Sequence, residues 1–144
     1  MRLSTKGRYA VMAMVDLARR QDERAVSLAD IAERQEISLS YLEQLFARLR
    51  RSGLVVSARG PGGGYRLARE ASAVSIAAIV LAVDEPLHAT RCGDHRAAGC
   101  MKKGERCLTH DLWDEMGRKI QDYLESVSLA DVVLGRLGGE RKAA

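Results

Sequence analysis

The stretch SLADIAERQEISLSYLEQLFARLRRSG, residues 27–53, predicts two short helices separated by a turn of about four residues. Ser27 and Ser38 stand where a hydroxyl can cap the first turn of a helix, and Gly53 can end the second helix in the left-handed conformation. The second helix has one apolar side, formed by Leu39, Leu42, Leu45, Phe46 and Leu49. Its other side is polar and basic, which is typical of the DNA-contacting helix of a helix-turn-helix.

A hairpin is expected directly after these helices. The segments LVVS (54–57) and YRLA (65–68) have strand character, and the loop ARGPGGG (58–64) joins them. The loop lacks the Gly-Lys-Ser/Thr sequence of a phosphate-binding loop, so a nucleotide-hydrolysis site is not indicated. A plain flexible hairpin is one interpretation. Arg59 at the tip favours the other, the wing of a winged helix that contacts a partner.

Two further helices complete the predicted N-terminal domain, residues 1–84. A helix from about Lys6 to Arg20 has apolar residues at helical spacing, namely Val11, Met14, Val15 and Ala18. A short apolar helix over 75–84 is expected to be buried and to end before Pro86. The predicted fold class is therefore mainly α, a winged helix-turn-helix with a two-stranded wing.

Charge is distributed unevenly along the chain. Residues 1–70 hold 13 Lys/Arg against 8 Asp/Glu, whereas residues 71–144 hold 10 against 11. Between Gln44 and Arg69 there are six arginines and no acidic residue. A solvated charged face is one explanation, and binding to a polyanion such as DNA is the other.

The composition, 47% hydrophobic and 29% charged over 144 residues, suits one domain that folds without disulfides. The N-terminal MRLSTKGRYA lacks the apolar core of a signal peptide, and no apolar run reaches membrane-spanning length. We therefore expect a cytoplasmic protein with reduced thiols and no membrane partner.

The stretch RCGDHRAAGCMKKGERCLTH, residues 91–110, holds all three cysteines and two of the three histidines. Cys92, Cys100, Cys107 and His110 form a complete four-ligand set, and Cys107 and His110 are one helical turn apart. Zinc accepts Cys3His, although gaps of seven and six residues are long for a structural zinc site. An iron–sulfur cluster accepts ligands from a wider loop. Unrelated surface cysteines are less expected, and nothing nearby indicates an enzyme.

A long helix should follow this loop (85–108), begin after Thr109 as its N-cap, and extend to about Glu125. Its apolar stripe consists of Leu112, Met116, Ile120, Tyr123 and Val127. The stripe can pack on its own domain or on a second copy of the chain, and we expect the second copy, because helix-turn-helix proteins commonly bind DNA as dimers. SLAD recurs at 128–131 as a second helix start, so residues 109–134 form the predicted dimerisation region and 135–144 a disordered tail.

Several segments together resemble the bacterial winged-helix regulators of the Rrf type, and among these the regulators that sense iron–sulfur clusters. The segments are MRLSTKGRYAV, SLSYLEQLFARLR, GLV with RGPGGGY, AVDEP, and the pair RC and CLTH. The resemblance implies a homodimeric repressor or activator of cluster-assembly genes, with cluster-donor scaffold proteins as further partners. It implies a 2Fe–2S cluster on Cys92, Cys100, Cys107 and His110. The gaps between the cysteines exceed those usual for the family, so His95 is an alternative to His110. A nitric-oxide-sensing relative could use a carboxylate at position 8 as a ligand, whereas this sequence has Arg8 there.

The DNA contacts expected for such a protein fall on three segments. They are the first helix start (Ser4, Thr5, Lys6, Tyr9), the recognition helix (Ser38, Ser40, Tyr41, Glu43, Gln44, Arg48, Arg51) and the wing (Arg59, Gly60, Pro61, Gly62). Gln44 suits adenine and Glu43 can accept from cytosine N4 in the major groove, while Arg59 suits a narrow minor groove. A dimer would place two recognition helices about 34 Å apart on a pseudo-palindromic double-stranded site.

Overall fold

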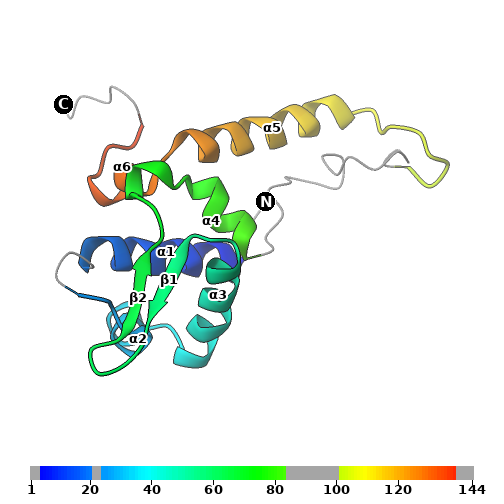
Figure 1. Ribbon diagram of the computed structural model, residues 1–144. Helices are drawn as coiled ribbons and strands as arrows, with labels where there is room; N and C mark the ends of the chain where they lie inside the picture. The colour runs from blue at the N-terminus through cyan, green and yellow to red at the C-terminus, as the bar shows by residue number, and fades with distance from the viewer. Residues whose placement is uncertain (1–3, 21–23, 84–100, 139–144) are drawn as a thin grey trace.

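The computed structural model describes residues 4–20, 24–83 and 101–138. In these ranges the elements are α1 (Thr5–Arg20), α2 (Leu28–Gln35), α3 (Leu39–Arg51), β1 (Val55–Ala58), β2 (Gly64–Leu67), the 3-10 turn η1 (Ala71–Ala73), α4 (Ile76–Ala82), α5 (His110–Ser126) and α6 (Leu129–Val133). Helix α1 lies in the middle, with α2, α3 and the hairpin on one side and α4, α5 and α6 on the other (Figure 1). The predicted mainly helical class with a two-stranded sheet is confirmed.

The helix-turn-helix follows the local signals in the sequence. The Asp30 N–H donates to Ser27 Oγ at 3.1 Å, and the Tyr41 N–H donates to Ser38 Oγ at 3.2 Å, so both predicted caps are confirmed. Gly53 ends α3 with φ of 75°, in the left-handed region. The apolar side of α3 is buried except for Leu39, which is 42% exposed because it opens the helix at the turn from α2.

The hairpin is antiparallel, and its register pairs Val55 with Leu67 and Ala58 with Gly64. Each strand is displaced by one residue from its predicted position, since β1 begins at Val55 and β2 begins at Gly64. Val26 forms an isolated antiparallel bridge with β2. Its N–H donates to the Tyr65 carbonyl at 3.0 Å, and its carbonyl accepts from the Tyr65 N–H at 2.8 Å. The wing is therefore fixed to the segment that leads into α2.

The buried side of α1 includes the predicted Met14 together with smaller residues. Ala10, Ala13, Met14 and Leu17 are fully buried, whereas Val11, Val15 and Ala18 are only partly buried against the core. Helix α1 contacts α2 and α3 on one side and α4 and α6 on the other, and alanine lets these neighbours approach its backbone closely. Of the predicted apolar residues, Met14 therefore lies in the core, and Val11, Val15 and Ala18 pack against it.

The segment after α5 returns to the same core as the helix-turn-helix. The Ile76 N–H donates to the Val127 carbonyl at 2.9 Å, and the Leu129 N–H donates to the Val74 carbonyl at 2.7 Å. Leu129 is fully buried, and Ser128 and Asp131 form a reciprocal capping box that starts α6. The C-terminal end of α5 is thus fixed to the body, while its N-terminal end extends away from it (Figure 1). Among the described helices none has the length and apolarity needed to cross a membrane.

Candidate nucleic-acid interface and metal-ligand segment

The outer face of α3 is polar and accessible. Ser38, Ser40, Glu43 and Gln44 are exposed, and the hydroxyls of Ser38 and Ser40 lie 3.0 Å apart. Since the Ser38 oxygen accepts from the backbone of Tyr41, the first turn of α3 is fixed before any partner arrives. The predicted base-reading side chains therefore project together from one ordered helix face.

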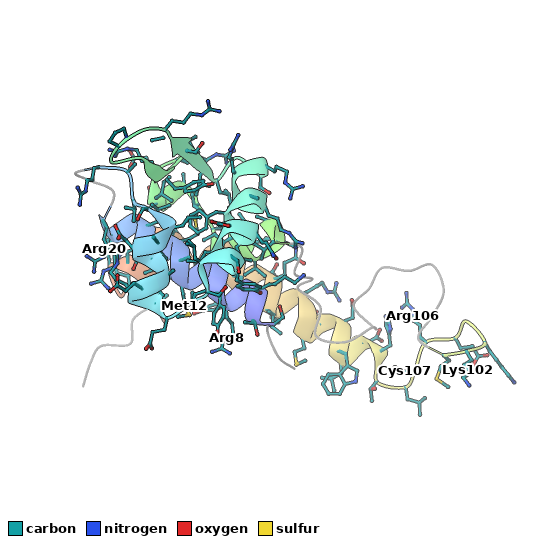
Figure 2. The ribbon with its side chains drawn as sticks, turned by 90° about the horizontal axis from the view of Figure 1, so that it is seen from below. Arg8, Met12, Arg20, Lys102, Arg106 and Cys107 are labelled. Atoms are coloured by element: carbon teal, nitrogen blue, oxygen red, sulfur yellow. The ribbon has the colours of Figure 1, made fainter. Side chains whose placement is uncertain are left out.

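An aromatic contact brings the start of α1 beside the start of α3. The rings of Tyr9 and Tyr41 meet edge to face, with centroids 6.0 Å apart and an interplanar angle of 84°. Ser4 closes the first turn of α1, as its carbonyl accepts from the Arg8 N–H at 3.3 Å. The side chain of Arg8 lies on the outside of this helix (Figure 2). The structure thus unites the predicted contacts at 4–9 with those of the recognition helix.

The wing tip presents Arg59, Gly60, Pro61 and Gly62 to solvent. Gly60 and Gly62 have φ of 95° and 75°, which only glycine adopts easily, and the Gly63 N–H closes the turn on the Gly60 carbonyl at 2.8 Å. The tip therefore forms a glycine-dependent turn that its own backbone closes.

The two arginines predicted on α3 lie in different surroundings. Arg51 is exposed and its Nε donates to the Ala47 carbonyl one turn earlier, at 3.4 Å. Arg48 is partly buried, and its Nη1 donates to the Val83 carbonyl at 3.1 Å, at the C-terminal end of α4. Arg48 therefore connects the recognition helix to the last described residue before the cysteine-rich segment.

A buried ionic group that the sequence reasoning missed joins α1 to α2. Asp16 is 4% exposed, and it accepts from Arg34 Nη2 at 2.7 Å, Arg34 Nε at 3.0 Å and Gln35 Nε2 at 2.8 Å. Burial raises the pKa of Asp16, but the hydrogen bonds from Arg34 and Gln35 and the charges of Arg34 and Arg20 lower it further, so the net pKa lies below 3.8. A signal was present, because Asp16 is the sole acidic residue of α1 and neighbours its buried face.

Of the predicted metal ligands, Cys107 and His110 lie in the described part of the chain, whereas Cys92, His95 and Cys100 lie outside it. The His110 N–H donates to the Cys107 carbonyl at 3.1 Å, so both residues belong to the turn that starts α5. Cys107, Arg106 and Lys102 lie at the end of the molecule distant from the helix-turn-helix (Figure 2). No group of three ligand-type side chains occurs among the residues that the structure describes.

Thr109 stands at the N-cap of α5, as predicted, but its hydroxyl does not cap the helix. Instead Trp113 Nε1 donates to Thr109 Oγ1 at 2.9 Å, and Cys107 Sγ lies 3.8 Å from the same oxygen. An indole N–H can only donate, so Thr109 Oγ1 accepts from Trp113 and its own hydrogen is available to the sulfur. This arrangement suits a thiolate, and the exposed cations Lys102, Lys103 and Arg106 lie in the same segment. The donor set of three thiolates and one imidazole suits a 2Fe–2S cluster or zinc.

Helix α5 leaves most of its apolar stripe uncovered in the single chain. Leu112 is 59% and Tyr123 is 52% exposed, Met116 and Ile120 are partly exposed, and Val127 packs against the core. Gly117 is the buried residue of this helix. The predicted dimer-interface residues therefore share one accessible helix face, apart from Val127.

Comparison with known proteins gives consistent results. The sequence model of the Rrf2 family, described as an iron-dependent transcriptional regulator, matches residues 3–134. The chain is 55% identical to the HTH-type transcriptional regulator IscR of Yersinia enterocolitica over 133 residues, which cover 92% of this chain and 79% of that protein. It is 56% identical to IscR of Erwinia tasmaniensis over the same length and coverage.

Solved structures agree with the sequence matches. The structure of T. potens IscR superposes with a TM-score of 0.75 at 38% identity, and covers 100% of this chain and 93% of that one. CymR, the global cysteine regulator of B. subtilis, superposes with a TM-score of 0.79 at 32% identity, covering 94% and 98%. These relatives are transcription regulators and not enzymes, and this chain shares their winged-helix fold. The chain belongs to the Rrf2 family of transcriptional regulators and is of the IscR type.

Proposed function

We propose that this chain acts as a homodimeric DNA-binding regulator that senses iron–sulfur cluster supply and controls cluster-assembly genes. The cluster would be 2Fe–2S, held by Cys92, Cys100, Cys107 and His110. The observation that carries the proposal is the turn at the start of α5. There the His110 N–H donates to the Cys107 carbonyl and Thr109 Oγ1 lies 3.8 Å from the Cys107 sulfur, beside an uncovered apolar helix face.

DNA recognition would use the exposed face of α3 in the major groove. Glu43 and Gln44 would contact base edges, because a carboxylate accepts from cytosine N4 and an amide pairs with adenine. Arg59 on the wing turn would enter an adjacent minor groove, and Ser4, Thr5, Lys6 and Tyr9 would contact the backbone. Glu43 is the most informative residue for sequence selectivity, since a carboxylate that faces phosphates is unfavourable unless a base donates a hydrogen bond to it.

Dimer formation would use the stripe of Leu112, Met116, Ile120 and Tyr123. Pairing of two α5 helices would cover side chains that are accessible in the single chain. A two-fold dimer then matches a pseudo-palindromic site with half-sites about 34 Å apart.

Coupling between the cluster and DNA would run through α5. Because His110 is both a proposed ligand and the first residue of this helix, cluster occupancy bears on the order of the helix start and on the dimer. The cluster can shift DNA affinity only as far as it stabilises one arrangement over another. The alternative function keeps the DNA-binding dimer and gives the cysteines a structural zinc or another redox, iron or nitric-oxide signal.

The experiment compares DNA binding by cluster-loaded wild type and by Cys92→Ala on a panel of promoter sites. We expect the two proteins to differ in which sites they bind, and identical binding across the panel would contradict the coupling. On the same panel, Glu43→Ala should relax discrimination between matched and mismatched sites. The control is Glu115→Ala on α5, whose side chain is 55% exposed and which should leave discrimination unchanged.

A further inference from the structure

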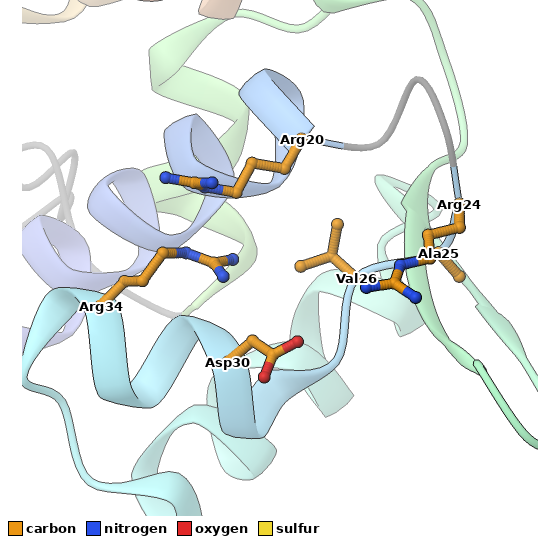
Figure 3. Close-up of a pocket in the computed structure, with 6 residues that line it drawn as sticks. All are labelled: Arg20, Arg24, Ala25, Val26, Asp30 and Arg34. Carbon is orange, nitrogen blue, oxygen red and sulfur yellow. The ribbon is translucent and has the colours of Figure 1, made fainter.

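Three arginines from consecutive segments surround a polar cavity beside the helix-turn-helix. Arg20 ends α1, Arg24 precedes the strand-like residue Val26, and Arg34 lies on the last turn of α2. The cavity holds about 180 Å³, and Ala25, Val26 and Asp30 complete its lining (Figure 3). We propose that this cavity binds a phosphate group of the DNA backbone. The proposal rests on the DNA-binding function above and adds a contact outside the three segments that the sequence predicted.

One of the three guanidinium groups, that of Arg34, is held in place before a ligand arrives. The Asp16 side chain is 2% exposed and holds Arg34 through two hydrogen bonds, while Arg20 Nε lies 3.9 Å from the same carboxylate. A side chain fixed in this way loses little rotamer entropy when it binds an anion. Planar guanidinium donors also match the oxygen geometry of phosphate better than an ammonium group does.

The position of the cavity in the fold favours a phosphate of the DNA backbone as its ligand. Val26 in its lining is hydrogen-bonded to Tyr65 of the wing, so the cavity, which is lined by the end of α1, residues 24–26 and α2, lies beside the point where the wing is attached. In a helix-turn-helix the first helix crosses the phosphate backbone while the second enters the major groove. Arg24 projects into the opening from the wing side, opposite Arg34 on α2 (Figure 3).

The charges of the cavity make the proposal testable in both directions. Its three arginines are opposed by Asp16, which is buried behind it, and by Asp30, which lines it. The cations are in excess by one. The Asp30 carboxylate makes no hydrogen bond or ion pair among the described contacts, where only its backbone N–H is bonded, to Ser27. Its charge opposes an arriving phosphate. Removal of the Asp30 charge should therefore strengthen phosphate binding, whereas removal of the Arg24 charge should weaken it.

The experiment measures DNA affinity by fluorescence anisotropy at several salt concentrations, on matched and mismatched sites. For Arg24→Gln we expect the slope of log K against log salt to fall by about 0.9 per dimer half-site, an affinity loss of about eightfold at 0.1 M salt, with the matched-to-mismatched ratio unchanged. Asp30→Asn should raise affinity on both kinds of site. Arg136→Gln is the matched control, since this arginine is 61% exposed, lies after α6 and does not line the cavity.

Three results would overturn the proposal. An unchanged slope for Arg24→Gln would remove the contact, and an equal loss for Arg136→Gln would reduce it to a general charge effect. Heat released by inorganic phosphate without DNA, abolished by Arg24→Gln while the DNA slope stays unchanged, would make the cavity a small-anion site. Arg24 makes no hydrogen bond or ion pair within the described part of the fold, so the variant should melt like wild type. Wild type that binds no site specifically would defeat the proposed function itself.

Discussion

Loss of Arg34 should destabilise the protein far more than loss of Arg20, although both arginines face the same carboxylate. Arg34→Ala leaves Asp16, with a side chain 2% exposed, without its two shortest charged contacts. Removal of one partner from a buried ion pair costs about 3–5 kcal/mol. Gln35 still donates at 2.8 Å, so we expect the lower end, about 3 kcal/mol.

The control is Arg20→Ala. Arg20 is 54% exposed and its Nε lies 3.9 Å from Asp16, so its loss should cost less than about 1 kcal/mol. Urea unfolding at pH 7 measures both variants. In a domain of this size a loss of about 3 kcal/mol lowers the Tm by about 6–12 °C.

The pH dependence gives an independent test of the same group. Since the pKa of Asp16 is lowered in the folded protein, its carboxyl contributes stability above pH 3.8, and this contribution is lost as the pH falls through the folded-state pKa. Without Arg34 the burial of Asp16 works against the charged form, so the loss of stability below pH 5 should become smaller in Arg34→Ala. Equal costs for the two arginine variants, or an unchanged acid-side slope in Arg34→Ala, would refute this reasoning.

Three further predictions concern the wing, the apolar stripe of α5 and the turn of residues 107–110 that starts α5. A Cβ on Gly64 would lie 2.2 Å from the Val26 carbonyl oxygen, so Gly64→Ala should lower the unfolding free energy by about 1–3 kcal/mol more than Gly62→Ala, where the space is open and only the positive φ opposes a side chain; equal costs would contradict this. Leu112→Glu should shift the protein from dimer to monomer in sedimentation velocity without lowering helix content, and an unchanged sedimentation coefficient would exclude this face. Thr109→Val should speed the anaerobic loss of visible cluster absorption, whereas Thr109→Ser should keep the wild-type half-life; equal half-lives in all three proteins would remove the hydroxyl from the account.

The helix-turn-helix could be predicted because its signals are local. Ser27 and Ser38 cap their helices three residues ahead, and Gly53 supplies a conformation that most residues avoid. Such features depend on a few neighbouring residues, so the sequence carries them directly. The strand positions were off by one residue because the register, which pairs Val55 with Leu67 and Ala58 with Gly64, depends on contacts across the hairpin and not on neighbouring residues.

The features that escaped prediction depend on long-range packing. Asp16 and Arg34 are 18 residues apart, and no local pattern specifies that pairing. Thr109 was expected to cap α5, but Trp113 Nε1, one turn later, donates to the Thr109 hydroxyl oxygen, which makes no capping bond with the helix backbone. Arg48 was assigned to DNA from its charge, and the structure adds a bond to Val83 that only the fold could reveal. The assignments of the metal ligands and of the DNA and dimer contacts stay predictions, as do the domain limits and the disordered tail at 135–144.

The most direct test of the central claim is a metal and sulfide analysis of protein purified without oxygen. Iron, acid-labile sulfide and zinc are measured per chain together with the visible absorption spectrum, for wild type and for Cys107→Ala. A 2Fe–2S site predicts about two irons and about two sulfides per chain in wild type, and their loss in Cys107→Ala. One zinc per chain without sulfide would contradict the cluster and make these residues a structural zinc site.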